Sequence, residues 1–236
     1  MKEIKILHLF PKLLSLYGEY GNLAVLRSTL ENNGCSVQID PYEDGPLNPK
    51  DYDLVYVGTG TEDNLMEAIR RLMPYKAEIA ASINGGNLWL ATGNAMTLFG
   101  TTVNRYGAVS EALGCFAYNT ILHDDRRYLG DVLTEEAFGG SFVGFINTSS
   151  VFEGITTPLL TLKLNTGLGN DKKGCSDGFR AGNFFGTQLI GPVLVKNPHF
   201  LCHICRDLTG TEIVIGADTN IQKAYQVALS ELRARV

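Results

Sequence analysis

The sequence lacks the features that mark a membrane protein or a nucleic-acid-binding protein. None of its apolar runs approaches the ~18–20 residues that a membrane span needs. It has no basic block, and its 20 Lys and Arg residues are outnumbered by 25 Asp and Glu residues. Nucleic acids and anionic membranes both attract positive charge, so we expect neither as the main partner. The chain is predicted to have no membrane span and no nucleic-acid ligand.

Cysteine is also scarce. The five cysteines are odd in number and scattered: Cys35, Cys115, Cys175, Cys202 and Cys205. Residues 1–9 read as a short strand rather than as a signal peptide, which predicts free thiols in a reducing cytoplasm. The chain shows no repeat, no low-complexity tract and no linker. We therefore expect a single domain over residues 1–236.

The most informative stretch runs from Gly85 to Gly100. Residues 88–91 form a short apolar run typical of a strand buried on both faces of a parallel sheet. Thr92, Gly93 and Asn94 interrupt this run, and residues 95–99 resume it with helical spacing. A strand, a sharp turn and a helix make up a nucleophile elbow, which raises one side chain above the strand ends. The residue at the elbow is Gly93, which has no side chain.

Strands and helices alternate up to Gly100, which predicts a parallel sheet with helices on both faces. The expected strands are 4–10, 36–40, 53–58 and 88–91, and the expected helices are 23–33, 64–73 and 74–81. After Gly100 short strands joined by Gly-rich turns are expected at 132–133, 142–146, 159–164, 183–185 and 189–194. The Gly-rich stretch 165–182 is predicted to be a surface loop, and 196–208 and 218–236 are predicted to be helical.

Several motifs occur together in one order along residues 4–200. They are Leu-Tyr-Gly-Glu-Tyr-Gly-Asn at 16–22, Gly-Thr-Gly-Thr-Glu-Asp at 58–63, Gly-Phe-Ile-Asn at 144–147, Gly-Leu-Gly-Asn at 167–170, Gly-Thr-Gln-Leu-Ile-Gly-Pro at 186–192 and Lys-Asn-Pro at 196–198. In these motifs the chain resembles the class I glutamine amidotransferase domains of the cobyric acid synthase (CobB/CobQ) type. The likeness is greatest to the GatD-type glutaminase subunits of lipid II isoglutaminyl synthases, which partner a Mur-ligase-like (MurT-type) subunit.

This resemblance implies a flavodoxin-like three-layer α/β/α sandwich, with a mostly parallel sheet and antiparallel strands in the second half. It also implies a mechanism in which a cysteine at the elbow attacks the glutamine amide. A histidine in the motif at 186–192 then moves the proton. In this chain the cysteine position is Gly93 and the histidine position is Ile190. The nearby glutamate of the family falls on Ile146. Since nucleophile and base are both absent, we expect no glutaminase activity.

The resemblance also implies which residues face a ligand. The Gly60 N–H matches a donor of the family's oxyanion hole, although a tight turn needs glycine there as well. Arg127 matches an arginine beside the glutamine site, where it pairs with a carboxylate; the alternative is a surface arginine. Asn94 and Thr92 flank the elbow, and helix capping is the expected role of Asn94.

One further cluster has metal-ligand spacing. His199, Cys202 and His203 share one helix face at i, i+3 and i+4. No second group of ligands accompanies them, so no metal and no other cofactor is predicted.

Two classes of function remain open on the sequence alone. The favoured one is a degenerate amidotransferase domain that acts by binding, either as a partner of a Mur-ligase-like subunit or as a sensor of a small amino acid or amide. The other is an active hydrolase that uses residues outside the family pattern, such as Thr92 or a metal at the His199 cluster.

Overall fold

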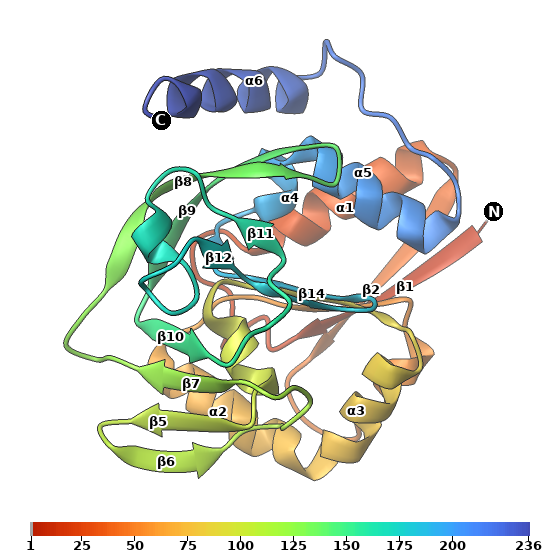
Figure 1. The fold of residues 1–236 in the computed structure, drawn as a ribbon. Helices are drawn as coiled ribbons and strands as arrows, with labels where there is room; N and C mark the ends of the chain where they lie inside the picture. The colour runs from red at the N-terminus through yellow and green to blue at the C-terminus, as the bar shows by residue number, and fades with distance from the viewer. Residues whose placement is uncertain (1) are drawn as a thin grey trace.

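The computed structural model describes residues 2–236 and contains a central six-stranded sheet, visible in Figure 1. The strand order is β13-β14-β4-β3-β1-β2. The bounds are β1 (Lys2–Leu9), β2 (Cys35–Tyr42), β3 (Leu54–Val57), β4 (Leu88–Thr92), β13 (Phe179–Ala181) and β14 (Phe184–Thr187). All neighbours pair in parallel except β13, which is antiparallel to β14. The mostly parallel sheet is as predicted.

Helices cover both faces of this sheet. One face carries α1 (Tyr20–Asn32), α4 (Val193–Lys196) and α5 (Pro198–Thr209), and the other carries α2 (Glu62–Leu72) and α3 (Lys76–Asn84). Short 3₁₀ turns lie at Pro49–Asp51 (η1) and Met73–Tyr75 (η2). The predicted three-layer α/β/α sandwich is confirmed.

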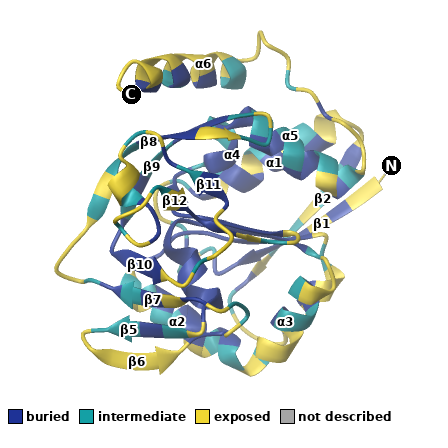
Figure 2. Cartoon of the chain, viewed as in Figure 1, coloured by how far each residue is buried: buried dark blue, intermediate teal, exposed yellow. Residues whose placement is uncertain are grey.

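The alternation of side chains along each strand explains the two layers of core. On β1, Ile4 and Ile6 point to the α1 and α5 side, whereas Leu7 and Leu9 point to the α2 side. All four are at most 2% exposed, and Figure 2 colours the middle of the central sheet mostly as buried. A strand covered on both faces is apolar throughout, which is why these runs are visible in the sequence.

The second half adds smaller sheets at one side of the main one. A four-stranded sheet has the order β10-β7-β5-β6, a three-stranded sheet the order β15-β9-β8, and β11 pairs with β12. Their bounds are β5 (Thr102–Arg105), β6 (Ala108–Glu111), β7 (Asn119–Leu122), β8 (Tyr128–Ala137), β9 (Gly140–Thr148), β10 (Ser150–Glu153), β11 (Leu160–Thr161), β12 (Ser176–Asp177) and β15 (Leu189–Ile190). The last helix, α6 (Asn220–Arg233), packs on the three-stranded sheet through Tyr225, Leu229 and Leu232.

Three local expectations were wrong. The segment after the elbow is a 3₁₀ turn, η3 (Gly93–Phe99), rather than an α-helix, and all seven of its residues are buried. Strand β14 is not part of an antiparallel half, since it pairs with β4 in the main sheet. Only Leu189–Ile190 of the expected strand 189–194 is extended, because Pro192 ends it and α4 follows.

The predicted surface loop 165–182 is in fact partly interior. It holds the 3₁₀ turn η4 (Thr166–Leu168) and strands β12 and β13. Asn170 and Asp177 are 4% and 0% exposed. The Asn170 amide donates to the carbonyl of Gly178 at 2.8 Å, and Asp177 accepts from the Thr187 hydroxyl at 2.7 Å. The glycines indicated turns correctly, but buried side-chain bonds hold those turns inside the fold.

Within residues 2–236, none of the helices combines the length and the apolar character that crossing a membrane requires.

Candidate functional site

The turn from β4 into η3 forms the centre of the candidate site. Gly93 has a φ of +63°, the left-handed conformation in which glycine is favoured. Thr92 before it and Asn94 after it are 0% and 3% exposed. The backbone therefore makes the strand-to-turn transition predicted for an elbow, at the carboxyl end of the parallel strands.

The space above Gly93 is filled by Thr59, from the turn that follows β3. A Cβ atom placed on Gly93 would overlap the Thr59 hydroxyl oxygen and would lie 2.9 Å from the Thr59 Cβ. Thr59 is itself 2% exposed. The elbow thus has no room for any side chain at position 93 while threonine stands at 59.

A buried carboxyl group, Glu19, organises the polar atoms around the elbow. It lies just before α1 and is 0% exposed. One oxygen accepts from the Thr92 hydroxyl at 2.5 Å and from the Tyr56 hydroxyl at 2.7 Å. The other accepts from the Gly191 N–H at 2.8 Å and from the Thr59 hydroxyl at 3.3 Å. We call Glu19, Tyr56, Thr59, Thr92 and Gly191 the elbow network.

Burial has a large effect on the titration of this network. Desolvation raises the pKa of Glu19 to about 7, although the hydrogen bonds from Thr92, Tyr56, Gly191 and Thr59 act in the opposite direction. Burial, together with the Glu19 charge, raises the pKa of Tyr56 well above its usual value. Thr92 and Glu19 have the pairing of a nucleophile and its base, but both are enclosed and Thr59 covers the elbow.

Gly60 and Asn94 bind each other. The Gly60 N–H donates to the Asn94 side-chain oxygen at 3.1 Å, and the Asn94 amide donates to the Gly60 carbonyl at 2.7 Å. The N–H expected to hold an oxyanion is therefore already bonded. Asn94 does not cap a helix as predicted; it joins the turn after β3 to the turn after β4.

The positions of the family base and acid lie in the apolar core. Ile190 in β15 pairs with Phe145 of β9, and Ile146 lies opposite Leu189. Ile190 and Ile146 are 5% and 0% exposed, and Ile146 belongs to the core cluster on the α1 and α5 side. No proton-transfer group stands at either position.

Arg127 lies on the rim, with its side chain 44% exposed. Its guanidinium donates to the Asn147 side-chain oxygen at 2.9 Å and to Glu62 at 3.3 Å. Glu62 also accepts from the Ser149 hydroxyl at 2.6 Å, and the Asn147 amide donates to Tyr17 at 3.2 Å. The arginine is thus paired within the chain and anchors the start of β8 to the start of α2.

Comparison with known proteins identifies this arrangement. Residues 5–198 match the model of the CobB/CobQ-like glutamine amidotransferase domain. The chain belongs to this family.

Two curated relatives are the GatD subunits of lipid II isoglutaminyl synthase (glutamine-hydrolyzing). The one from Streptococcus pneumoniae is 26% identical over 235 residues, which cover 97% of this chain and 88% of the relative. The one from Staphylococcus aureus is 26% identical over 200 residues, covering 84% and 81%. The resemblance to the GatD type noted from the motifs is confirmed.

Solved structures agree on the fold. A crystal structure of a glutamine amidotransferase aligns with a TM-score of 0.54 and 15% identity, covering 87% of this chain and 99% of the other. A glutamine amidotransferase from Thermotoga maritima aligns with a TM-score of 0.52 and 12% identity, covering 98% and 92%. The flavodoxin-like class I fold is confirmed.

The cysteines and histidines of this amidotransferase domain do not meet at the elbow. Cys35 opens β2 and so lies at the amino edge of the sheet, opposite the elbow. The His199 ring centroid lies 4.8 Å from that of Phe142, edge-on, and 5.4 Å from that of Tyr225, and neither His199 ring nitrogen has a hydrogen-bond partner within residues 2–236. Across residues 2–236 no three His, Cys, Asp or Glu side chains are grouped as metal ligands.

The sequence-based reasoning missed Glu19, Thr59 and Tyr56 as members of the site. Glu19 is a lone acid in the turn before an amphipathic helix, a position at which solvent exposure is the usual expectation. Thr59 stands between two glycines, Gly58 and Gly60, in the turn after β3. Its consequence becomes apparent only when β3 and β4 are placed side by side.

Proposed function

We propose that this chain is a catalytically inactive glutamine amidotransferase-like subunit that docks on a Mur-ligase-like, amide-forming partner. Family membership and the likeness to proteins named as synthase subunits support a role in a complex. We place it in the cytoplasm as one domain, and its five free cysteines are consistent with a reducing compartment.

One observation carries the proposal. At the elbow, the space that a nucleophile on residue 93 would fill is taken by Thr59, which is tied to Glu19. A chain that had lost only its cysteine would keep an open pocket over Gly93. Here the pocket is closed by hydrogen-bonded groups, so the change supports a role other than glutamine hydrolysis.

Two alternatives were considered against the same geometry. A sensor that holds an amino acid or amide at the elbow needs the Gly60 N–H, which Asn94 occupies, and a free Arg127, which Glu62 and Asn147 engage. An active hydrolase that uses Thr92 has one observation in its favour, the 2.5 Å bond to Glu19. It requires Thr59 to move aside before any substrate can reach Thr92.

An ammonia-release assay with glutamine tests inactivity. We expect no release above buffer from the chain alone or with its partner. Release that disappears in Thr92→Val but persists in Lys163→Met, a change at an exposed lysine, would contradict the proposal and establish the Thr92 hydrolase.

Restoring the family's cysteine and histidine is a stricter test of inactivity, because the overlap with Thr59 identifies a third residue that must change. Gly93→Cys with Ile190→His is expected to stay inactive, since the cysteine overlaps Thr59. Adding Thr59→Gly opens the space, and we expect the triple variant to regain measurable glutamine hydrolysis. Activity in the double variant equal to that in the triple would show that Thr59 does not close the site.

Partner docking is tested by affinity purification of the tagged chain from its native cells. We expect an ATP-dependent amide ligase of the Mur type in a 1:1 ratio. Recovery of the chain without such a ligase would contradict the docking role.

A further inference from the structure

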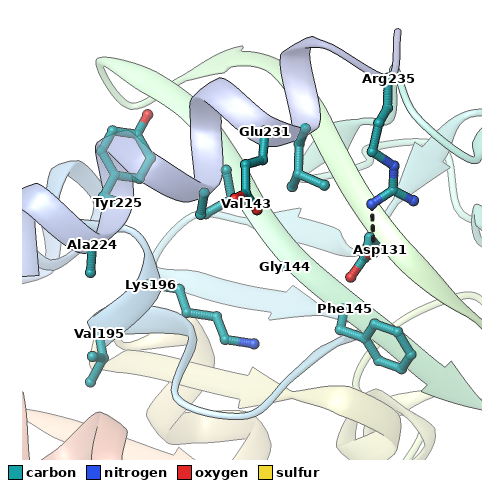
Figure 3. A pocket seen from close by; sticks show the side chains of 12 residues that line it. Asp131, Val143, Gly144, Phe145, Val195, Lys196, Ala224, Tyr225, Glu231 and Arg235 are labelled. Carbon is teal, nitrogen blue, oxygen red and sulfur yellow. Dashed lines mark hydrogen bonds and ion pairs between the residues drawn. The ribbon is translucent and has the colours of Figure 1, made fainter.

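A cavity of about 300 Å³ lies beneath α6, on the other side of Gly191 from the elbow, and is drawn in Figure 3. Its roof is α6, and its floor is formed by β9 and α4. Val143, Phe145 and Leu232 give it apolar walls. Its volume is at the lower end of the range for small-molecule sites, which is about 300–1,000 Å³.

Lys196, from the end of α4, brings a positive charge into this cavity (Figure 3). Among residues 2–236 its ammonium group has neither a hydrogen bond nor an ion pair. Burial lowers the pKa of Lys196, while the charges of Glu19 and Asp131 partly offset this effect. A partly desolvated ammonium group without a partner gains most from a bound carboxylate.

Glu231 enters the same cavity from α6, on the opposite wall (Figure 3). Its carboxylate likewise has no partner in the described part of the chain. The other two charged side chains that line the cavity, Arg235 and Asp131, pair with each other at 2.7 Å. The Tyr225 hydroxyl donates to the carbonyl of Ser141 at 2.9 Å. One cation and one anion on the walls of this cavity thus remain available to a ligand.

We propose that this cavity binds a free α-amino acid. The carboxylate of the ligand pairs with Lys196, its ammonium group pairs with Glu231, and its side chain contacts the apolar walls. A zwitterion matches both free charges, whereas a simple acid or a simple amine satisfies only one. The site differs from the elbow, and the proposal does not depend on whether the elbow is inactive.

The test is thermal unfolding and calorimetry of the full chain with each of the twenty proteinogenic L-amino acids. A ligand that binds the folded state raises Tm with the logarithm of its concentration. We expect at least one amino acid to do so below about 10 mM. The matched amine and the matched acid, each lacking one charge of that amino acid, are expected to have no effect at the same concentration. If none of the twenty raises Tm, the proposal fails.

Variants locate the site. Lys196→Met and Glu231→Gln are each expected to weaken binding by about 10-fold or more, the usual effect of losing one charge-assisted bond. Lys196→Arg keeps the charge and is expected to retain part of the affinity. Lys163→Met, an exposed lysine outside the cavity, serves as the control and should bind as the unchanged chain does.

The binding measurements on these variants either support the proposed amino-acid site or overturn it. Equal binding by Lys196→Met and Lys163→Met would place the ligand elsewhere and overturn the proposal. If Lys196→Met fails to fold, Glu231→Gln carries the same comparison, because Glu231 is exposed on α6 and has no partner to lose.

Discussion

The elbow and the α6 cavity lie on either side of Gly191 and differ in how their polar groups are used. At the elbow Glu19, Thr59 and Thr92 bond to one another or to their immediate neighbours. In the cavity Lys196 and Glu231 bond to nothing among residues 2–236. Groups that satisfy each other rigidify a fold and leave nothing for a ligand, whereas unpaired charges are the ones a ligand can satisfy. The polar groups at the elbow thus hold the turn in place, whereas two charges in the cavity are available to a ligand.

The largest expected effect comes from adding one methyl group at the elbow. Gly93→Ala introduces both left-handed strain and overlap with Thr59, and we expect it to lower the free energy of unfolding by about 4 kcal/mol in urea titrations. Gly107→Ala is the matched control. Its φ is +81°, but nothing lies within 4 Å of the added carbon. We expect that control to lower the free energy of unfolding by about 1 kcal/mol, from the left-handed strain alone.

The overlap component can be isolated in a double-mutant cycle. In a Thr59→Gly background, Gly93→Ala is expected to cost no more than Gly107→Ala. A cost at residue 93 that Thr59→Gly leaves unchanged would mean that the elbow is not filled as described.

The next effect concerns the pH dependence of stability set by Glu19. Its pKa in the folded state is about 7, above the unfolded value of 4.5, so the folded state holds the proton more strongly between these values. The stabilisation that Glu19 contributes is therefore complete at low pH and is lost as the pH rises through 7. We expect the free energy of unfolding to fall by about 3 kcal/mol between pH 4 and 8 because of this group. Gln is isosteric with the protonated acid and does not titrate.

The measurement is the difference in unfolding free energy between the unchanged chain and Glu19→Gln at several pH values. We expect the advantage of glutamic acid to shrink as pH rises. The buried histidines are common to both proteins and cancel in the difference. A difference that stays constant from pH 4 to 8 would show that Glu19 does not hold its proton in the folded state.

His8 is expected to act with the opposite sign. It is 7% exposed beside Tyr56, its Nε2 has no partner, and burial lowers its pKa to about 4. The unfolded chain takes up the proton first, so stability falls as pH falls below 6.5. Relative to His8→Leu, the unchanged chain should lose about 2 kcal/mol between pH 6.5 and 5. Parallel stability curves for the two proteins would argue against a neutral buried imidazole.

The smallest effect is expected on the rim. Arg127 is 44% exposed, and its bonds to Glu62 and Asn147 are solvent-accessible. Arg127→Ala should therefore change the unfolding free energy by less than about 1 kcal/mol. A loss of several kcal/mol would show that the rim, like the elbow, is part of the structural core.

The first hundred residues were the easier part to predict, because β3 and β4 are buried along their whole length and α2 is strongly amphipathic. The turn at Gly93 could also be predicted, since a glycine between an apolar strand and a new apolar segment is a local signal. Strand β14 could not be placed, because its partner β4 lies about ninety residues earlier and nothing local specifies that pairing. Local patterns predict elements, whereas long-range pairing depends on the whole fold.

The candidate site shows the same contrast between local features, which could be predicted, and long-range contacts, which could not. The absence of a side chain at Gly93 and the apolar side chain at Ile190 could be read from the sequence. The filling of the space above Gly93 could not, because it results from contacts among Glu19, Thr59 and Thr92, which come from three separate segments of the chain. Asn94 shows the limit most clearly: a polar residue after a strand suggests a cap, yet its partner is Gly60, thirty-four residues away.

The side chain of Asn197, between α4 and α5, has a mechanical consequence for the α6 cavity. Its oxygen accepts from the Val143 N–H at 2.9 Å and its amide donates to the Val143 and Val193 carbonyls at 3.1 and 2.9 Å, so it continues the β9 edge as an extra strand would. Clamped in this way, Lys196 and Val143 keep a fixed spacing. The opposite wall is α6, which is held by the apolar contacts of Tyr225, Leu229 and Leu232, so different kinds of interaction fix the two walls of the cavity.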